Sequence, residues 1–192
     1  MVPSPDLSDN VLRPLLRDGA EAWRDFLASR GKLFHGFIPA DAEGALEALL
    51  PLRNECQSFL ELGSGIGLIT ILADLLGFEA YGIEIVPELW DTSVRLAEDH
   101  GSNATFVEGS FVPTEFRGEI DLLDADFHTV TEGADGYEEL GMELCDFDLV
   151  YGYPWPGEED WMTELVRSGA GPHTRMLRYS VSDGYEVVSF SD

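Results

Sequence analysis

Lysine is almost absent from this sequence. Ten arginines and the single Lys32 stand against 37 aspartates and glutamates, which gives a net charge of −26. A surface of this charge repels phosphate groups, so an exposed track for nucleic acid is not expected. Two explanations of the acidity stay open, solubility through self-repulsion and adaptation to high salt.

Cysteine, clustered histidine and long apolar runs are also scarce. Cys56 and Cys145 are too few for a zinc cluster and are predicted to be free thiols. The four histidines lack the spacing of metal ligands, so no metal site is expected. No run approaches the roughly 18 consecutive apolar residues of a membrane span, and the N-terminus lacks the features of a signal peptide. We therefore expect a soluble, cytoplasmic protein with no membrane partner.

The most informative stretch covers residues 59–84. An apolar segment leads into Gly63, Gly65 and Gly67, then residues at helical spacing follow, then a second apolar run that ends at Glu84. This order predicts a strand, a glycine turn, a helix and a strand. Glycines let a ligand lie close to the turn, and a carboxylate about 20 residues further on can accept hydrogen bonds from both ribose hydroxyls. Glu84, 17 residues after Gly67, suits that role.

The glycine spacing separates two classes of nucleotide. A turn that binds a nicotinamide or flavin dinucleotide has the pattern G-x-G-x-x-G. Counted from Gly63 the last glycine would fall on Leu68, and counted from Gly65 it would fall on Thr70. Neither register fits, so a nicotinamide-dependent oxidoreductase is disfavoured.

The pattern that is present is G-x-G-x-G, preceded by Glu61 near the end of the first strand. It closely resembles motif I of the class I S-adenosylmethionine-dependent methyltransferases. The resemblance implies a Rossmann-like, doubly wound, mostly parallel α/β sheet with helices on both faces, and S-adenosylmethionine as cofactor. It implies that Glu61 helps to fix the amino-acid end of the cofactor through water. Gly63, Gly65 and Gly67 would make room for the cofactor, and Glu84 would hold the ribose.

The same resemblance suggests an adenine pocket. The residue after the ribose acid, Ile85, would pack against the ring. The third strand, expected over residues 105–111, ends where the family often has Gly-Asp-Ala, with the aspartate accepting from the adenine amino group. Here Ser110 stands in the place of the aspartate and Phe111 follows. A hydroxyl can still accept that hydrogen bond, although the residue departs from the family pattern.

The fourth strand, expected over residues 147–156, resembles motif IV of amino-methyltransferases without its leading Asn or Asp. Ligands of open parallel sheets lie beyond the carboxyl ends of the strands, so Tyr151, Tyr153 and Trp155 are predicted to line the acceptor pocket. Aromatic faces can surround a methyl-bearing cation. The missing polar residue argues against a mechanism copied from the base-amine enzymes. A proline-stiffened turn with Trp155 as a core residue is the alternative.

Residues 1–50 are predicted to form an N-terminal helical extension or lid, and residues 51–192 the cofactor-binding domain. The first ten residues are expected to be loose, and a helix is expected to begin at Asp18, with Glu21 completing a capping box, and to end before Gly31. Asp41 is expected to cap a second helix that Pro51 stops. Between them, residues 32–39 are a loop in which His35 is either a proton acceptor or incidental.

The acidic segment 112–146 contains a candidate strand over residues 120–123. It is either a helix with an insertion that bears on the substrate or a solvated acidic face, and both remain open. A helix over residues 158–167 follows. Strands over 174–179 and 185–190 are expected to form a hairpin. The family sheet has seven strands and only six are expected here, so the hairpin is predicted to be truncated.

These patterns together predict a methyltransferase whose acceptor is a small molecule or a protein side chain. No residue stands out as an obligatory general base, and transfer to an amine or thiolate does not need one. The competing hypothesis is a catalytically inactive module that keeps the cofactor site and contacts a protein partner. The oligomeric state stays open.

Overall fold

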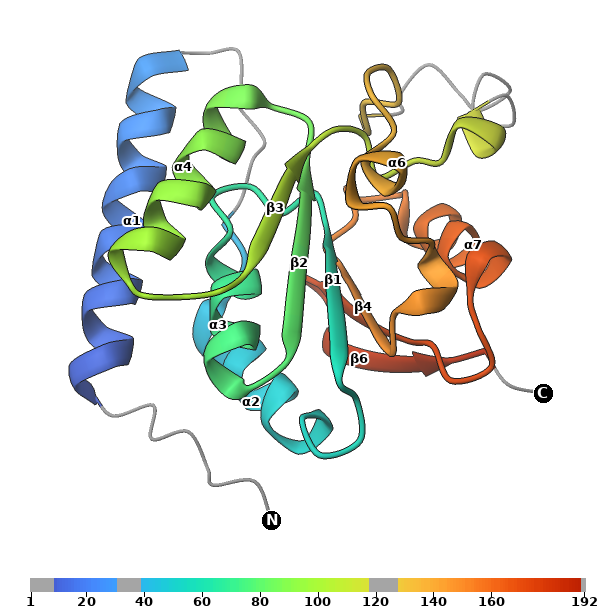
Figure 1. Cartoon of the computed structure of the whole chain (residues 1–192), viewed down its shortest axis with the longest axis horizontal. Coiled ribbons are helices and arrows are strands. Elements are labelled where there is room, and N and C mark those ends of the chain that lie inside the picture. Colours follow the sequence, from blue (N-terminus) through green and yellow to red (C-terminus); the bar gives the residue numbers. More distant parts are fainter. Residues whose placement is uncertain (1–8, 31–38, 118–127, 191–192) are drawn as a thin grey trace.

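A computed structural model of the chain describes residues 9–30, 39–117 and 128–190 (Figure 1). Within them the strands are β1 (Ser58–Leu62), β2 (Glu79–Glu84), β3 (Thr105–Glu108), β4 (Leu149–Gly152), β5 (Arg175–Ser180) and β6 (Gly184–Ser189). The helices are α1 (Asp9–Arg30), α2 (Ala42–Leu52), α3 (Leu68–Leu76), α4 (Pro87–Asp99), α6 (Gly136–Leu140) and α7 (Glu159–Gly169). Two short 3₁₀ turns cover Thr114–Phe116 and Leu144–Asp146.

The strands form one sheet in the order β3-β2-β1-β4-β5-β6. Neighbouring strands are parallel except β6, which is antiparallel to β5. The first three strands follow one another from the centre of the sheet to one edge, and β4 then pairs with the other side of β1. The strand order therefore reverses between β1 and β4, which is where ligands bind in open α/β sheets.

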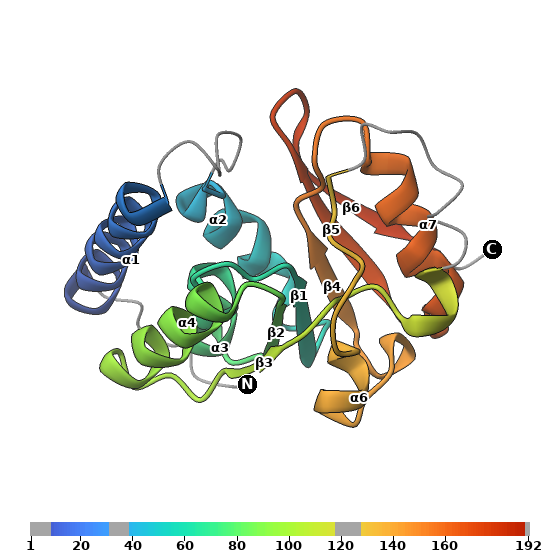
Figure 2. The same ribbon diagram turned by 90° about the horizontal axis from the view of Figure 1, so that it is seen from above.

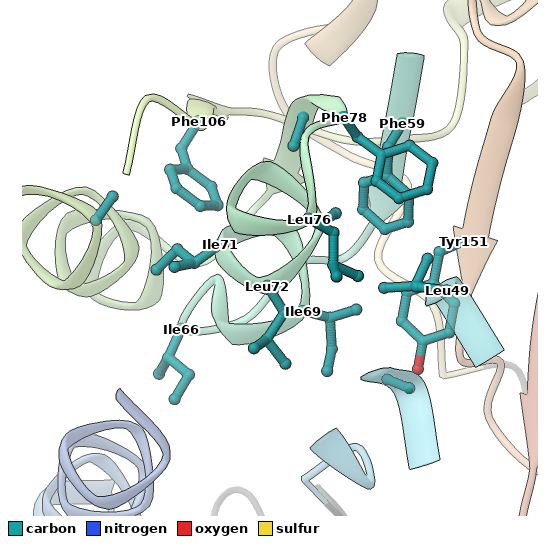
Figure 3. Packing of buried hydrophobic residues seen from close by; sticks show 14 of the residues in the cluster. Leu49, Phe59, Ile66, Ile69, Ile71, Leu72, Leu76, Phe78, Phe106 and Tyr151 are labelled. Carbon is teal, nitrogen blue, oxygen red and sulfur yellow. The ribbon is translucent and has the colours of Figure 1, made fainter. Parts of the chain in front are cut away.

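Side chains along each central strand alternate between two hydrophobic cores, as the pleat requires. Phe59 and Tyr151 lie in the first core with α1, α2, α3 and α4, whereas Leu60 and Val150 lie in the second core with α6 and α7. Figure 2 shows the two groups of helices on opposite faces of the sheet. Figure 3 shows the first core, in which residues of α3 pack toward the rings on β1 and β4. The predicted doubly wound sheet with a C-terminal hairpin is confirmed.

The first helix differs from its prediction. It starts at Asp9, nine residues before the expected cap at Asp18, and it continues through Pro14. The Asp18 carboxylate accepts from the Arg17 side chain at 2.8 Å and lies 3.1 Å from His100 Nε2 instead of capping a helix. Burial explains the longer helix, because Leu15 is fully buried in the first core and holds the early turns against the domain.

Several other boundaries also move. β3 ends at Glu108 and β4 covers only Leu149–Gly152, both shorter than predicted. Beyond β3 the backbone of Ser110 pairs with the segment around Asp135, so it no longer extends the ladder with β2. α2 passes Pro51 and ends at Leu52, while its predicted cap by Asp41 is confirmed, since that carboxylate accepts from the Gly44 N–H at 3.1 Å.

Some predictions fall on residues that the structure does not describe: His35, most of the loop over residues 32–39, and the candidate strand over 120–123. Cys56 and Cys145 are free thiols, as predicted. No described helix has the length and apolar character to cross a bilayer. Over residues 9–30, 39–117 and 128–190, no three His, Cys, Asp or Glu side chains gather as metal ligands would. The division of the chain at residue 50 stays a prediction, although α1 and α2 share the first core with the sheet.

Candidate functional site

A cavity of about 810 Å³ opens where the carboxyl ends of β1, β2 and β4 meet. That volume lies within the range of sites for small molecules and cofactors. Nine of the residues predicted for the site line it: Glu61, Gly63, Gly65, Glu84, Ile85, Phe111, Tyr151, Tyr153 and Trp155. Two predicted residues, Gly67 and Ser110, are not part of this lining.

The glycine turn presents open backbone to the cavity. Gly63 and Gly65 have φ angles of 73° and 57°, a region that side chains other than glycine rarely adopt. Among the described residues, a methyl group added at Gly65 would meet only Trp23, at 4.0 Å, and one added at Gly63 would meet only Phe111, at 3.5 Å. The backbone here is therefore approachable, as the cofactor prediction requires.

Gly67 serves a different purpose in the same turn. Its φ is 77°, and a Cβ there would lie 2.6 Å from both Phe106 Cζ and Ser93 Cβ. The glycine allows the start of α3 to approach β3 and α4. We conclude that Gly67 is required by packing, and its predicted contact with a cofactor stays a prediction.

Glu84 ends β2 with its carboxylate turned back toward the glycine turn. One oxygen accepts from the Gly65 N–H at 2.7 Å and the other from the Val86 N–H at 2.8 Å. The residue is 4% exposed, and this burial raises the pKa of Glu84 although the backbone donors oppose the shift. A carboxylate has about four acceptor positions. With the Gly65, Val86 and Ile85 N–H groups directed at it, the carboxylate keeps at least one position that can accept a ligand hydroxyl.

Glu61 ties β1 to the first turn of α3. One of its oxygens accepts from the Thr70 N–H at 2.9 Å and from the Thr70 hydroxyl at 2.5 Å. The residue preceding α3 is Gly67, which has no side chain to cap the helix, so Glu61 satisfies one of the free N–H groups of that end. Burial raises the pKa of Glu61 to about 8, the Thr70 hydrogen bonds oppose this, and the nearby Glu84 adds to it.

This pKa predicts a pH-dependent stability for Glu61→Gln. In wild type, the Glu61 carboxyl has a pKa near 4.5 in the unfolded chain and about 8 in the folded one. Its contribution to the free energy of unfolding is therefore fully present below pH 4.5 and is lost as pH rises toward about 8. A neutral glutamine has no such loss. Between pH 5 and pH 8 we expect the free energy of unfolding of the variant to gain about 2 to 4 kcal/mol relative to wild type. Urea titrations at the two pH values measure it.

Glu164→Gln is the control for that experiment, because this carboxylate is exposed on α7 and pairs with Arg167. It should leave the pH profile of wild type unchanged. Parallel pH profiles for wild type and Glu61→Gln would contradict the raised pKa.

Two of the three aromatic residues predicted for the acceptor pocket are tyrosines with different surroundings. Tyr151 is 1% exposed and stacks between Phe59 and Tyr185, with ring centroids 6.3 Å from each. Burial holds the pKa of Tyr151 well above its ordinary value, with Tyr185 and Glu61 adding to the shift, so its phenol is neutral. Tyr153 is partly exposed and meets Tyr179 edge-on at 4.9 Å. Tyr151 is therefore mainly a core residue at the cavity floor, while Tyr153 presents more surface.

Trp155 contacts His128, a residue of the acidic segment 112–146 whose role the sequence left open. The His128 ring stacks on it with centroids 5.3 Å apart. The buried Glu158 carboxylate holds this segment in place, accepting from the His128 N–H at 2.6 Å and from the Thr129 N–H and hydroxyl at 3.3 and 2.5 Å. Residues 128–130 consequently line the cavity. This part of the acidic segment 112–146 therefore lies at the cavity. Whether the segment contacts a substrate stays a prediction.

Ser110 is 1% exposed and makes local hydrogen bonds. Its hydroxyl accepts from the Val112 N–H at 3.1 Å and donates to the Val130 carbonyl at 3.5 Å. Since it does not line the cavity, its contact with adenine stays a prediction. Phe111, the next residue, does reach the cavity wall.

Comparisons with known proteins place this geometry in context. No protein-family model matches the chain. Over 90 residues, 47% of this chain, the sequence is 32% identical to the ribosomal protein L11 methyltransferase of Thermus thermophilus. The matched part spans 35% of that relative's length, about a third.

Similar solved structures cover more of the chain. An O-methyltransferase from Bacillus cereus in complex with S-adenosylhomocysteine has a TM-score of 0.55 and 15% identity, covering 92% of this chain and 68% of that one. A putative O-methyltransferase from Klebsiella pneumoniae has a TM-score of 0.54 and 16% identity, covering 91% and 66%. An RNA methyltransferase from Salinibacter ruber in complex with S-adenosyl-L-homocysteine has a TM-score of 0.51 and 18% identity, covering 73% and 76%. The chain therefore has the α/β Rossmann-like fold of the methyltransferases.

Proposed function

We propose that this chain is a methyltransferase that uses S-adenosylmethionine. The observation that carries the proposal is the position of Glu84, whose carboxylate is held against the glycine turn by the Gly65 and Val86 N–H groups at the rim of the cavity. A carboxylate at the end of the second strand, beside an open glycine turn, is the arrangement that binds a ribose.

The residues of the cavity fit this cofactor. Glu84 would accept from the ribose at the position that its backbone donors leave open, and the Gly63 and Gly65 backbone leaves room for close approach. Ile85 and Phe111 line the same cavity and would contact the adenine. Glu61 places a second, buried carboxyl group at the cavity, where the Thr70 N–H and hydroxyl hold it in position. When bound, S-adenosylmethionine supplies a methyl group on a positively charged sulfur.

The chain's own contribution is mainly positioning. Holding the two reactants in contact in a shaped, partly dry site supplies much of the rate enhancement of such a transfer. Tyr153 and Trp155 are the side chains we propose for the acceptor side, because both line the cavity at the end of β4. The acceptor itself is a small molecule or a side chain of another protein.

Calorimetric titration of S-adenosylmethionine and S-adenosylhomocysteine tests the proposal. We expect both to bind with dissociation constants in the micromolar range, and NAD to give no heat of binding, because the glycine spacing does not suit a dinucleotide. The titrations should be repeated at low and high salt because the net charge is −26. Absence of binding by a sample whose circular dichroism shows a folded protein would overturn the assignment.

A further inference from the structure

The described lining of the cavity is rich in acidic side chains, and His128 is its one basic side chain. Among the described residues that line it, Glu61, Glu84 and Glu159 carry ionisable carboxyl groups, and neither lysine nor arginine is present. The net charge of the whole chain, cavity residues included, is −26. An acceptor with a net negative charge would enter this cavity without a lysine or arginine to pair with among the described lining residues, which costs free energy as its water is removed. A cation would be attracted over a long range.

The end of the cavity beyond β4 has the groups that bind an organic cation. We call Tyr153, Trp155 and His128 the aromatic wall. Tyr153 and Trp155 line the cavity, and the His128 ring stacks on Trp155 with centroids 5.3 Å apart. The faces of the Tyr153 and Trp155 rings attract ammonium groups through their π electrons.

Glu159 supplies a carboxylate at the same end. It stands in the first turn of α7, lines the cavity, and accepts from the Gly157 N–H at 2.8 Å. The adjacent Glu158 cannot take this role, because its buried carboxylate is already used by His128 and Thr129. Glu159 therefore combines a held carboxylate with access to the cavity.

We propose that the methyl acceptor is a positively charged aliphatic amine, bound by Glu159 and the aromatic wall. The proposal rests on the proposed function. The ammonium group first gives a proton to solvent water. The freed nitrogen lone pair then forms the N–C bond while the C–S bond breaks and its electron pair stays on sulfur. The product is a methylammonium ion, whose positive charge the same carboxylate and rings accommodate.

Binding to the protein saturated with S-adenosylhomocysteine tests this directly. The probes are butyltrimethylammonium, 1,4-diaminobutane and a lysine-containing peptide, with pentanoate as the anion. Calorimetry in about 0.5 M NaCl screens the diffuse attraction of cations to the acidic surface. We expect at least one amine or ammonium probe to bind and pentanoate not to bind. Glu159→Gln should weaken the binding of the cation about two- to fivefold, as for loss of a partly exposed charge pair.

Asp160→Asn is the matched control. It removes one negative charge from the same first turn of α7, but Asp160 is exposed and does not line the cavity. The cation should bind this variant as it binds wild type. Equal weakening in the two variants, or binding of pentanoate in preference to every cation, would overturn the amine assignment.

The arms of the experiment separate the remaining outcomes. If 1,4-diaminobutane and butyltrimethylammonium bind and the peptide does not, the acceptor is a free small amine; if the peptide alone binds, it is a lysine side chain of a protein. If S-adenosylhomocysteine binds but none of the three cations does, the amine proposal fails while the proposed function stands. If S-adenosylhomocysteine does not bind to the folded protein, the proposed function fails, and the amine proposal that rests on it fails too.

Discussion

Replacing Glu84 by alanine is expected to weaken the binding of S-adenosylhomocysteine by roughly tenfold or more, which corresponds to about 1.4 kcal/mol. The variant loses the proposed acceptor of the ribose hydroxyls. It also leaves the N–H groups of Gly65 and Val86 without the carboxylate that orients the glycine turn. Calorimetric titration against wild type measures the change in dissociation constant.

Two further variants make that result interpretable. Glu79→Ala changes the exposed carboxylate at the opposite end of β2, where it accepts from Gln57 Nε2 at 3.2 Å, and should leave affinity unchanged. Glu84→Gln keeps one side-chain oxygen and similar size, so it guards against loss of folding and should fall between alanine and wild type. Full affinity in a folded Glu84→Ala protein would remove Glu84 from the proposed site.

Gly67→Ala is expected to cost about 3 kcal/mol or more of the free energy of unfolding. The substitution forces alanine into a φ of 77° and brings its Cβ to 2.6 Å from Phe106 and Ser93. The left-handed backbone conformation costs about 1 to 3 kcal/mol, and overpacking of a filled interior costs about 1 to 3 kcal/mol more. Urea denaturation followed by circular dichroism measures the loss.

Gly101→Ala is the appropriate comparison, because Gly101 has a similar φ of 65° but no atom of the described part of the chain lies within 4 Å of an added Cβ. It isolates the backbone cost, which we expect to be about 1 to 2 kcal/mol. If Gly67→Ala and Gly101→Ala are equally destabilising, the close contact with Phe106 and Ser93 does not contribute, and the packing role of Gly67 is wrong.

Much of the segment from β1 to β2 was predictable because its signals are local. The run from residue 59 to residue 84 contains a strand, a turn that needs glycine and a helix, each with its own periodicity. Three glycines at fixed spacing also fix where the turn lies, so the position of Glu84 beside it followed from counting residues. Its two hydrogen bonds to the turn were not predicted, since they depend on how β2 pairs with β1.

Other features depended on contacts between distant residues. The early start of α1 comes from burial of Leu15 in the first core, a stronger effect than the capping pattern at Asp18. The hydrogen bonds from His128 and Thr129 to Glu158 join residues about thirty positions apart, and no periodicity relates them. Equally, no local pattern distinguishes Glu159, which lines the cavity, from Glu158, which is buried beneath it.

The sequence by itself determined the order of strands and helices outside residues 112–146, the type of glycine turn and the acidic character of the molecule, because these follow from periodicity, spacing and composition. Only the tertiary structure decided which carboxylates face the cavity and which segment completes its wall. Strand order brings the ends of β1, β2 and β4 together, and buried hydrogen bonds then select one position for residues 128–130. Such choices depend on the free energy of packing distant segments, which no single stretch of sequence contains.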